Sequence, residues 1–338
     1  PVGTGNVALG NTALDSLTSG GNNTAIGRDA MTANTSGGTN VALGGRSLEA
    51  NTSASNNIAV GYGAMLVNTT GANNVGIGYN ALLSNTTANN TAVGYQAGYA
   101  NTTGNIQAFG RRALYSNTTG TNNTATGFNA LNQNTTGGEN TANGGYALYN
   151  NTTGSYNTAF GRAALENNTT ASNNTAVGYQ AGYSNTTGAQ NVAVGNAAFL
   201  DNTTGNYNTS LGTFALTNNT TASNNSAIGY STLSANTTGA SNTAVGHQAL
   251  QANTTASHNT AVGYQAGYSN QTAAGNVFVG ENAGYFNTNQ NNTFLGAGAG
   301  YFVTSGQKNS ILGRHNGNQH GLDIRTSSNN IVLSDGDG

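Results

Sequence analysis

Residues 90–99 read Asn-Thr-Ala-Val-Gly-Tyr-Gln-Ala-Gly-Tyr, and the same ten residues begin again at positions 174 and 259. Within this long period lies a much shorter one. A short apolar run that closes on Gly recurs nineteen times, and the interval between successive glycines is 17 in fifteen cases and 16 in the other three. The anchoring glycines are at positions 10, 27, 44, 61, 78, 94, 110, 127, 144, 161, 178, 195, 212, 229, 246, 263, 280, 296 and 313. Self-similarity at a fixed short period identifies a repeat protein.

Each unit has the same residue types at fixed distances from its Gly, which we call position 0. Position −1 is apolar in every unit except those with Thr126 and Asn143, and position −4 is Asn except where Ile106 stands. Position +3 is Ala in sixteen of the nineteen units. An Asn-Thr-Thr segment follows at positions +7 to +9 in most units. Identical units stacked on one another therefore align these residues into columns.

The repeat predicts an all-β fold, a parallel β-solenoid or β-roll of about nineteen 17-residue coils over residues 1–313. Such a unit is too short for a helical hairpin repeat, and Asn-Thr-Ala-Val-Gly has the β-branched content of a short strand. We expect the apolar side chains at position −1 to be buried by copies above and below. The Ala-Leu segment after the Gly is a second strand or a single helical turn, with the strand favoured. Residues 314–338 leave the repeat and form a separate C-terminal segment.

The small residue at position +3 bears on assembly. Ala in nearly every unit suggests the close approach of another backbone, which favours lateral packing of several chains, with three around an axis preferred. The alternative is a lone solenoid in which both Ala and the following Leu face inward. We expect self-association as a homotrimer or filament.

Composition excludes several functional classes. Only 5% of the residues are charged and the net charge is −2, so no basic patch is available for nucleic acid. The chain has no Cys and no apolar run of about 18 residues, so we expect neither thiol chemistry nor membrane insertion. Carboxylates are few and dispersed, and we expect no enzyme, no cofactor and no metal site. His315 and His320 lie near Asp323, but two His with one Asp is a weak metal pattern.

The Asn-Thr-Thr column matches the N-glycosylation acceptor pattern. The alternative is structural, because stacked Asn amides form hydrogen-bonded ladders and Asn and Thr favour turns. A third interpretation is an ice-binding array of Thr side chains, although adjacent Thr residues in a strand point to opposite faces. The candidate acceptors are Asn68, Asn85, Asn101, Asn117, Asn134, Asn151, Asn168, Asn185, Asn202, Asn219, Asn236 and Asn253.

Position +1 carries a column of aromatic residues with interspersed Arg. These side chains either bind sugars or a partner or cover the neighbouring coils, and the covering role is favoured. The column comprises Tyr62, Tyr79, Tyr95, Phe128, Tyr179, Tyr230 and Tyr264 with Arg28, Arg111, Arg162 and Arg314, while His247 takes a position that Tyr fills elsewhere.

Two resemblances follow from these motifs. Asn6-Val7-Ala8-Leu9-Gly10 and its copies resemble the head repeat of trimeric autotransporter adhesins, which implies a trimeric parallel β-roll; the added Asn-Thr-Thr-Gly residues depart from that pattern. Residues 328–338 resemble the segment that precedes the cleaved chaperone domain of phage tail fibres. Together they imply a structural component of an extracellular or virion fibre on a virion or cell surface, with adhesion to host surface glycans as a further expectation. The alternative function is ice binding.

Overall fold

The computed structural model describes residues 3–335 and has the predicted all-β architecture, a parallel β-solenoid of about nineteen coils. Within the described residues the chain forms strands and turns and no helix. It divides into two compact units, which we call unit 1 (residues 1–171) and unit 2 (residues 172–338), and each repeat within them is called a coil. The last three residues of the C-terminal segment, 336–338, lie outside the described residues.

Every coil contributes one short strand that ends at or just before its Gly. Unit 1 contains β1 (Val7–Leu9), β2 (Thr24–Ile26), β3 (Val41–Leu43), β4 (Ile58–Val60), β5 (Val75–Ile77), β6 (Thr91–Val93), β7 (Ile106–Phe109), β8 (Asn123–Thr126), β9 (Thr141–Asn143) and β10 (Thr158–Phe160). Unit 2 contains β11 (Thr175–Val177), β12 (Val192–Val194), β13 (Thr209–Leu211), β14 (Ser226–Ile228), β15 (Thr243–Val245), β16 (Thr260–Val262), β17 (Val277–Val279), β18 (Thr293–Leu295), β19 (Ser310–Gly313), β20 (Asn318–Gln319), β21 (Leu322–Asp323) and β22 (Ile331–Ser334).

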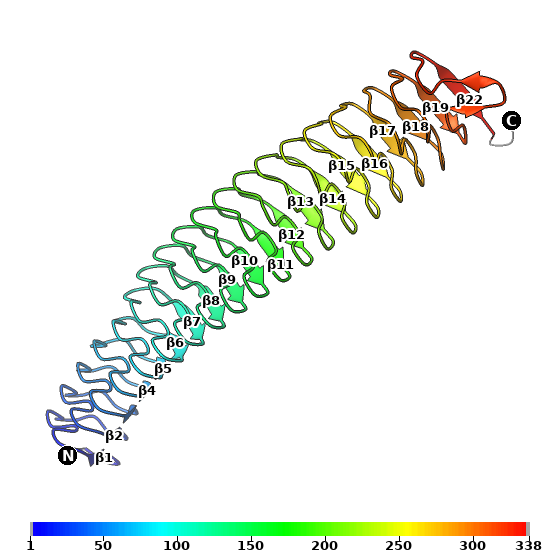
Figure 1. Cartoon of the computed structure of the whole chain (residues 1–338). Coiled ribbons are helices and arrows are strands. Elements are labelled where there is room, and N and C mark those ends of the chain that lie inside the picture. Colours follow the sequence, from blue (N-terminus) through cyan, green and yellow to red (C-terminus); the bar gives the residue numbers. More distant parts are fainter. Residues whose placement is uncertain (1–2, 336–338) are drawn as a thin grey trace. The chain divides into compact units, whose positions relative to one another are not determined.

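Within each unit the strands of successive coils pair in parallel and in register with the repeat (Figure 1). Ala8 lies opposite Ala25, and Ala25 lies opposite Ala42. The backbone hydrogen bonds between coils continue outside the strands, as where the Thr35 amide donates to the Thr52 carbonyl at 2.8 Å. Each coil therefore satisfies its backbone groups through its two neighbours, which is why the repeats are stable only as a stack.

The segment after each Gly is a pair of tight turns, so the preferred prediction of a second strand is wrong. In the second coil Asp29 and Met31 have φ angles of 60° and 50°, which a β-strand does not adopt. The Ala30 amide donates to the Gly27 carbonyl at 3.3 Å, and the Asn34 amide donates to the Met31 carbonyl at 3.1 Å. Left-handed residues at every second position of this segment coil the chain tightly enough for each repeat to close within its short length.

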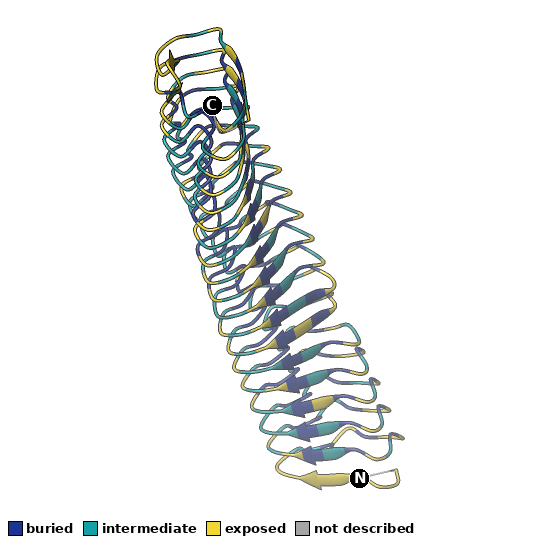
Figure 2. Cartoon of the chain, turned by 90° about the vertical axis from the view of Figure 1, so that its right-hand side faces the viewer, coloured by how far each residue is buried: buried dark blue, intermediate teal, exposed yellow. Residues whose placement is uncertain are grey.

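The core of each coil is small and is formed by positions −2, +3 and +4. In unit 1, Ala25, Ala30 and Met31 are each 0% exposed, and the equivalent residues of later coils are buried in the same way. Figure 2 shows a buried middle beside less buried ends in most strands, whereas β1 is exposed throughout. The Ala side chains at position +3 therefore face inward with the following large residue, as in the alternative interpretation of the Ala column. The Ala column is therefore no argument for the lateral packing of several chains.

The expectation that position −1 is buried is wrong. Exposure at this position in unit 1 reaches 37% at Ile77, 43% at Phe160 and 66% at Leu9. A three-residue strand alternates its side chains, so only its central residue, at position −2, points into the coil. Positions −1 and −3 share a face as the sequence indicates, but that face points outward.

Departures from the consensus compensate for one another in the core. Gly98 replaces the large residue at position +4, and a side chain there would collide with the Ile106 methyl group at 2.7 Å. Ile106, the one apolar residue at position −4, is 2% exposed and fills that space. In unit 2, Phe278 likewise occupies the space left by Gly267 and Gly284. The core volume is thus conserved by exchanges between coils, as close packing requires.

The C-terminal segment returns to the stack in unit 2. β22 pairs in parallel with β19, so Leu333 lies opposite Leu312, and the β20–β21 hairpin lies in the chain between them. The Asn330 amide donates to the Asn309 side-chain oxygen at 3.0 Å, which is the contact made by Asn at position −4 in regular coils. The parallel sheet therefore continues beyond Gly313, where the sequence repeat ends.

Candidate functional site

The Asn side chains of the Asn-Thr-Thr column lie inside the coils. All twelve candidate acceptors are at most 1% exposed: Asn68, Asn85, Asn101, Asn117, Asn134, Asn151 and Asn168 in unit 1, and Asn185, Asn202, Asn219, Asn236 and Asn253 in unit 2. Burying an amide is favourable only when its polar atoms are bonded. The contacts of this column show how that requirement is met.

Nearly all of these amides join their own turn to a neighbouring coil, whereas Asn68 bonds only to Gly71 in its own turn. Asn134 Nδ2 donates to Asn117 Oδ1 at 2.7 Å and to the Gly137 carbonyl at 2.9 Å. Its Oδ1 accepts a bond from Asn151 Nδ2 at 2.8 Å. The same pattern links Asn219 to Asn202 and Asn236 to Asn219 in unit 2. The side chains form the hydrogen-bonded ladder, and the folded coil leaves no room for a glycan on these nitrogen atoms.

A second buried ladder stands at position −4. Asn140 Nδ2 donates to the Gly154 carbonyl at 2.9 Å, while Asn140 Oδ1 accepts a bond from the Asn157 backbone amide at 3.0 Å. Both Asn residues are 0% exposed. These two columns supply polar contacts where a larger protein would place apolar residues, and they fix each coil at one height relative to the next.

The two Thr residues of the segment have different environments. Thr135 Oγ1 donates to the Thr152 carbonyl of the next coil at 3.0 Å, and Thr118 makes the same bond to Thr135. Thr136 is exposed. Because the first hydroxyl is bonded to the backbone and the pair lies in a turn, the segment does not present a flat double row of Thr.

The outer face of the strands is a regular surface of each unit. It combines position −1 with position −3, where Thr and Val predominate. In strands β1 to β10 no outward residue at either position is charged. The alternation of Thr or Val, Ala, and Val or Ile along each strand already shows that positions −3 and −1 share one face and position −2 lies on the other. Only the tertiary structure shows which of these two faces is inside.

The aromatic column at position +1 forms stacks on the outside of each unit. In unit 1 the ring centroids of Tyr62 and Tyr79 are 5.7 Å apart, and those of Tyr79 and Tyr95 are 5.4 Å apart. In unit 2, His247 is stacked between Tyr230 and Tyr264 at 5.2 and 5.3 Å. The rings cover neighbouring coils, as favoured from the sequence, and their faces are occupied by one another.

The C-terminal loop holds His315 and His320. His315 is 4% exposed, its Nδ1 accepts a bond from the Gly317 amide at 3.2 Å, and burial lowers its pKa. Asp323 instead pairs with Arg325, whose Nη2 lies 2.7 Å from Asp323 Oδ2. No group of three or more His, Asp or Glu side chains placed to hold a metal occurs in residues 3–335.

The Asp323–Arg325 pair gives a testable pH dependence. The Arg325 hydrogen bonds lower the pKa of Asp323 from 3.8 to about 2. Because the folded state favours the carboxylate, the stabilisation is present above the ordinary pKa of 3.8 and is lost as the pH falls through about 2. We expect an NMR titration of the Asp323 carboxyl to show this midpoint, and Arg325→Gln to raise it towards 3.8. Arg46→Gln, in unit 1, is the control; an unchanged midpoint in Arg325→Gln would contradict the assignment.

The described residues line several surface hollows. One in unit 1 has a volume of about 350 Å³ and is lined by Arg46, Glu49, Leu66 and Val67 among others. Its two charged residues are already paired, with Arg46 Nε 2.6 Å from Glu49 Oε2. The part of the chain that the structure describes also has no helix long and apolar enough to cross a membrane.

Comparison with known proteins gives no assignment. No protein-family model matches the chain, and searches of curated proteins and of solved structures find no match. The resemblances to adhesin heads and to phage tail fibres therefore rest on the short motifs alone. The function has to be inferred from the surfaces of the coils.

Proposed function

We propose that the chain is a structural component of an extracellular or virion fibre, in which copies associate laterally through the outer face of their strands. The observation that carries this proposal is the uncharged column at position −1, which is apolar except at Thr126 and Asn143 and remains partly exposed along each unit. A continuous apolar patch is costly in water and marks an interaction surface. The resemblance to trimeric adhesin heads supports three copies.

The same column explains why a second copy is a suitable partner. Its side chains recur once per coil at the spacing of paired strands, about 4.8 Å. An identical column has the same spacing, so the ridges of one copy fit the gaps of another along the whole length of a unit. An unrelated globular surface has no such period. The low charge of the chain removes the repulsion that usually keeps exposed strands apart.

The proposal predicts that the protein is a multimer and that lysines introduced on the outer face of the strands dissociate it. We expect native mass spectrometry to give a multiple of the 33.8 kDa chain mass, three-fold for a trimer. Ile77→Lys with Val93→Lys should shift the protein to the single-chain mass, because each introduced charge would be desolvated in the interface. Both side chains are partly exposed, so the lysines reach water in the separate chain and folding is retained.

The control places the same charges elsewhere on unit 1. Thr70→Lys with Thr119→Lys changes two exposed residues of the turn that follows the buried Asn, and the multimer should persist. Circular dichroism shows whether each variant keeps its strands. A single-chain mass for the unmodified protein, up to the highest concentration at which it dissolves, would end the proposal of lateral association.

A second candidate function is ice binding by the same face. Several strands pair an outward Thr at position −3 with an outward Val at position −1, as in Thr243 and Val245 or Thr260 and Val262. A regular array of hydroxyl and methyl groups favours an ordered water layer. A single-chain protein with thermal hysteresis would support this candidate, whereas a multimer without hysteresis would support the fibre.

A further inference from the structure

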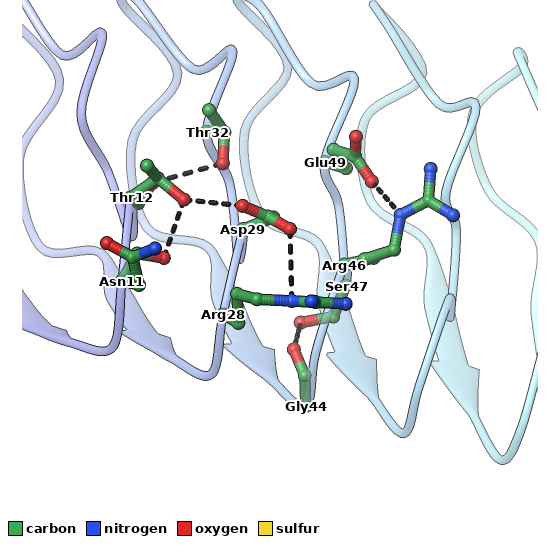
Figure 3. A network of polar contacts seen from close by, with 9 residues as sticks. All are labelled: Asn11, Thr12, Arg28, Asp29, Thr32, Gly44, Arg46, Ser47 and Glu49. Atoms are coloured by element: carbon green, nitrogen blue, oxygen red, sulfur yellow. Dashed lines mark hydrogen bonds and ion pairs between the residues drawn. The ribbon is translucent and has the colours of Figure 1, made fainter.

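The arginines of unit 1 fall into two groups. Three lie beside carboxylates: Arg28 Nε is 3.3 Å from Asp29 Oδ2, Arg46 pairs with Glu49, and the charge of Arg162 acts on Glu166. Figure 3 shows the first two pairs, together with the Thr12 hydroxyl that donates to Asp29. Arg111 and Arg112 form no ion pair with any described carboxylate. They are also the only adjacent cations in the sequence.

Arg111 is held between two aromatic rings of the column at position +1. Its guanidinium carbon lies 5.8 Å from the Tyr95 ring centroid and 5.2 Å from that of Phe128. These contacts are within the range of cation–π attraction. Both faces of the guanidinium are therefore covered, while Arg111 as a whole is exposed. The N–H groups at its edge remain available to a ligand.

Arg112 is oriented beside it by different contacts. Its Nε donates to Gln96 Oε1 at 3.1 Å, and its guanidinium carbon lies 5.3 Å from the Tyr115 ring centroid. The two terminal nitrogens make no hydrogen bond with another described residue. Two adjacent guanidinium groups are thus positioned by rings and an amide, with no anion to neutralise them.

We propose that Arg111 and Arg112, with Tyr95, Tyr115 and Phe128, form a binding surface for the anionic groups of an acidic polysaccharide. A planar guanidinium binds a carboxylate or sulfate through two parallel N–H bonds. The Tyr95 and Tyr115 hydroxyls supply donors and acceptors for sugar hydroxyls. The coils repeat along the unit, so an extended chain of sugars can follow the aromatic column on either side of the two arginines.

A glycan fits this surface better than a nucleic acid does. Tight binding of nucleic acid needs many phosphate contacts, and unit 1 has only these two cations without a nearby carboxylate among its described residues. Stacking of bases needs free ring faces. Here the faces of Tyr95 are covered by Tyr79 and Arg111, and Tyr115 is stacked on Tyr99 at 5.0 Å. The inference goes beyond the fibre proposal, because it requires one copy of unit 1 and no lateral association.

Calorimetric titration of the full chain tests the proposal with polyuronate, dextran sulfate, neutral dextran and a single-stranded oligonucleotide. We expect binding of one or both anionic glycans, weakened by salt, and none of neutral dextran. Comparison of polyuronate with dextran sulfate tells whether carboxylate or sulfate is the preferred group. Arg111→Gln with Arg112→Gln should weaken binding by about tenfold or more, because the variant loses the charge-assisted contacts of both guanidinium groups.

The matched control is Arg28→Gln with Arg46→Gln. These residues occupy the same two positions after their Gly, +1 and +2, and the variant loses the same net charge. It should bind within about twofold of the unmodified protein, because both arginines are already paired. Equal loss in the two variants, equal binding of neutral dextran, or preferential binding of the oligonucleotide would overturn the proposal. Native mass measured on the same samples separates this result from any change in self-association.

Discussion

Replacing Asn134 with Ala should lower the stability of the chain by several kcal/mol and lower its melting temperature accordingly. Asn134 is 0% exposed and makes two side-chain donations and one acceptance within unit 1. The variant leaves the Gly137 carbonyl without this donor and opens a gap in the ladder. Each unsatisfied buried group costs about 1–3 kcal/mol. Urea unfolding of the variant, followed by circular dichroism, measures the loss.

Thr136→Ala is the control for this experiment. Thr136 is exposed, so the change should alter stability by less than about 0.5 kcal/mol. Both substitutions destroy the same Asn-Thr-Thr acceptor pattern. A large loss in Asn134→Ala alone would therefore show that the column acts through its ladder. Equal stability of both variants would contradict the ladder as a source of stability.

Gly144→Ala should be among the most damaging single substitutions in unit 1. Gly144 has a φ angle of 136°, which L-residues rarely adopt, and an added Cβ would lie 2.5 Å from the Gly161 carbonyl oxygen. The strain alone costs on the order of 1–3 kcal/mol, and the collision with the backbone of the next coil adds to it. We expect a fall of several kcal/mol in the free energy of unfolding.

The neighbouring Gly145 provides the matched control. A Cβ at Gly145 would come no closer than 3.9 Å to the Phe128 carbonyl oxygen, and its φ is not positive. Gly145→Ala should therefore be neutral or slightly stabilising, by up to about 1 kcal/mol, because it restricts the unfolded chain. A comparable loss of stability in both variants would mean that the positive φ of Gly144 and its close contact with Gly161 are not the reason why glycine is needed at position 0.

Much of the fold followed from spacing and residue type. The near-constant interval between the anchoring glycines predicted the coils, and the β-branched residues before Gly94 and its equivalents predicted the strands. The Asn ladder was one of the alternatives that the Asn-Thr-Thr pattern allowed. The pair of turns after each Gly was not predicted, because residues such as Met31 and Leu48 rarely adopt positive φ. Burial of their side chains in the coil overrides that preference.

The candidate sites could be predicted from the sequence less directly than the fold. Ala at position +3 indicated close packing, but the sequence did not show which part of the molecule it packs against. In the structure these Ala side chains pack inside the coil itself. The exposed column at position −1 was assigned to the core because apolar residues are usually buried. Arg111 and Arg112 were visible as an adjacent pair, but their neighbours Tyr95 and Phe128 come from other coils. A sequence shows which cations exist, whereas only contacts between coils show which of them have partners.

By itself the sequence determined the period, the strand positions and the alignment of equal residues into columns, because so short a unit can satisfy its backbone only by stacking on copies of itself. The tertiary structure decided which columns are inside. The side chains at positions −2, +3 and +4 and the two Asn columns fill the interior of the coil, which is closed by left-handed turns. The apolar residues at position −1 are thereby placed outside, where they form the surface that a second copy can cover.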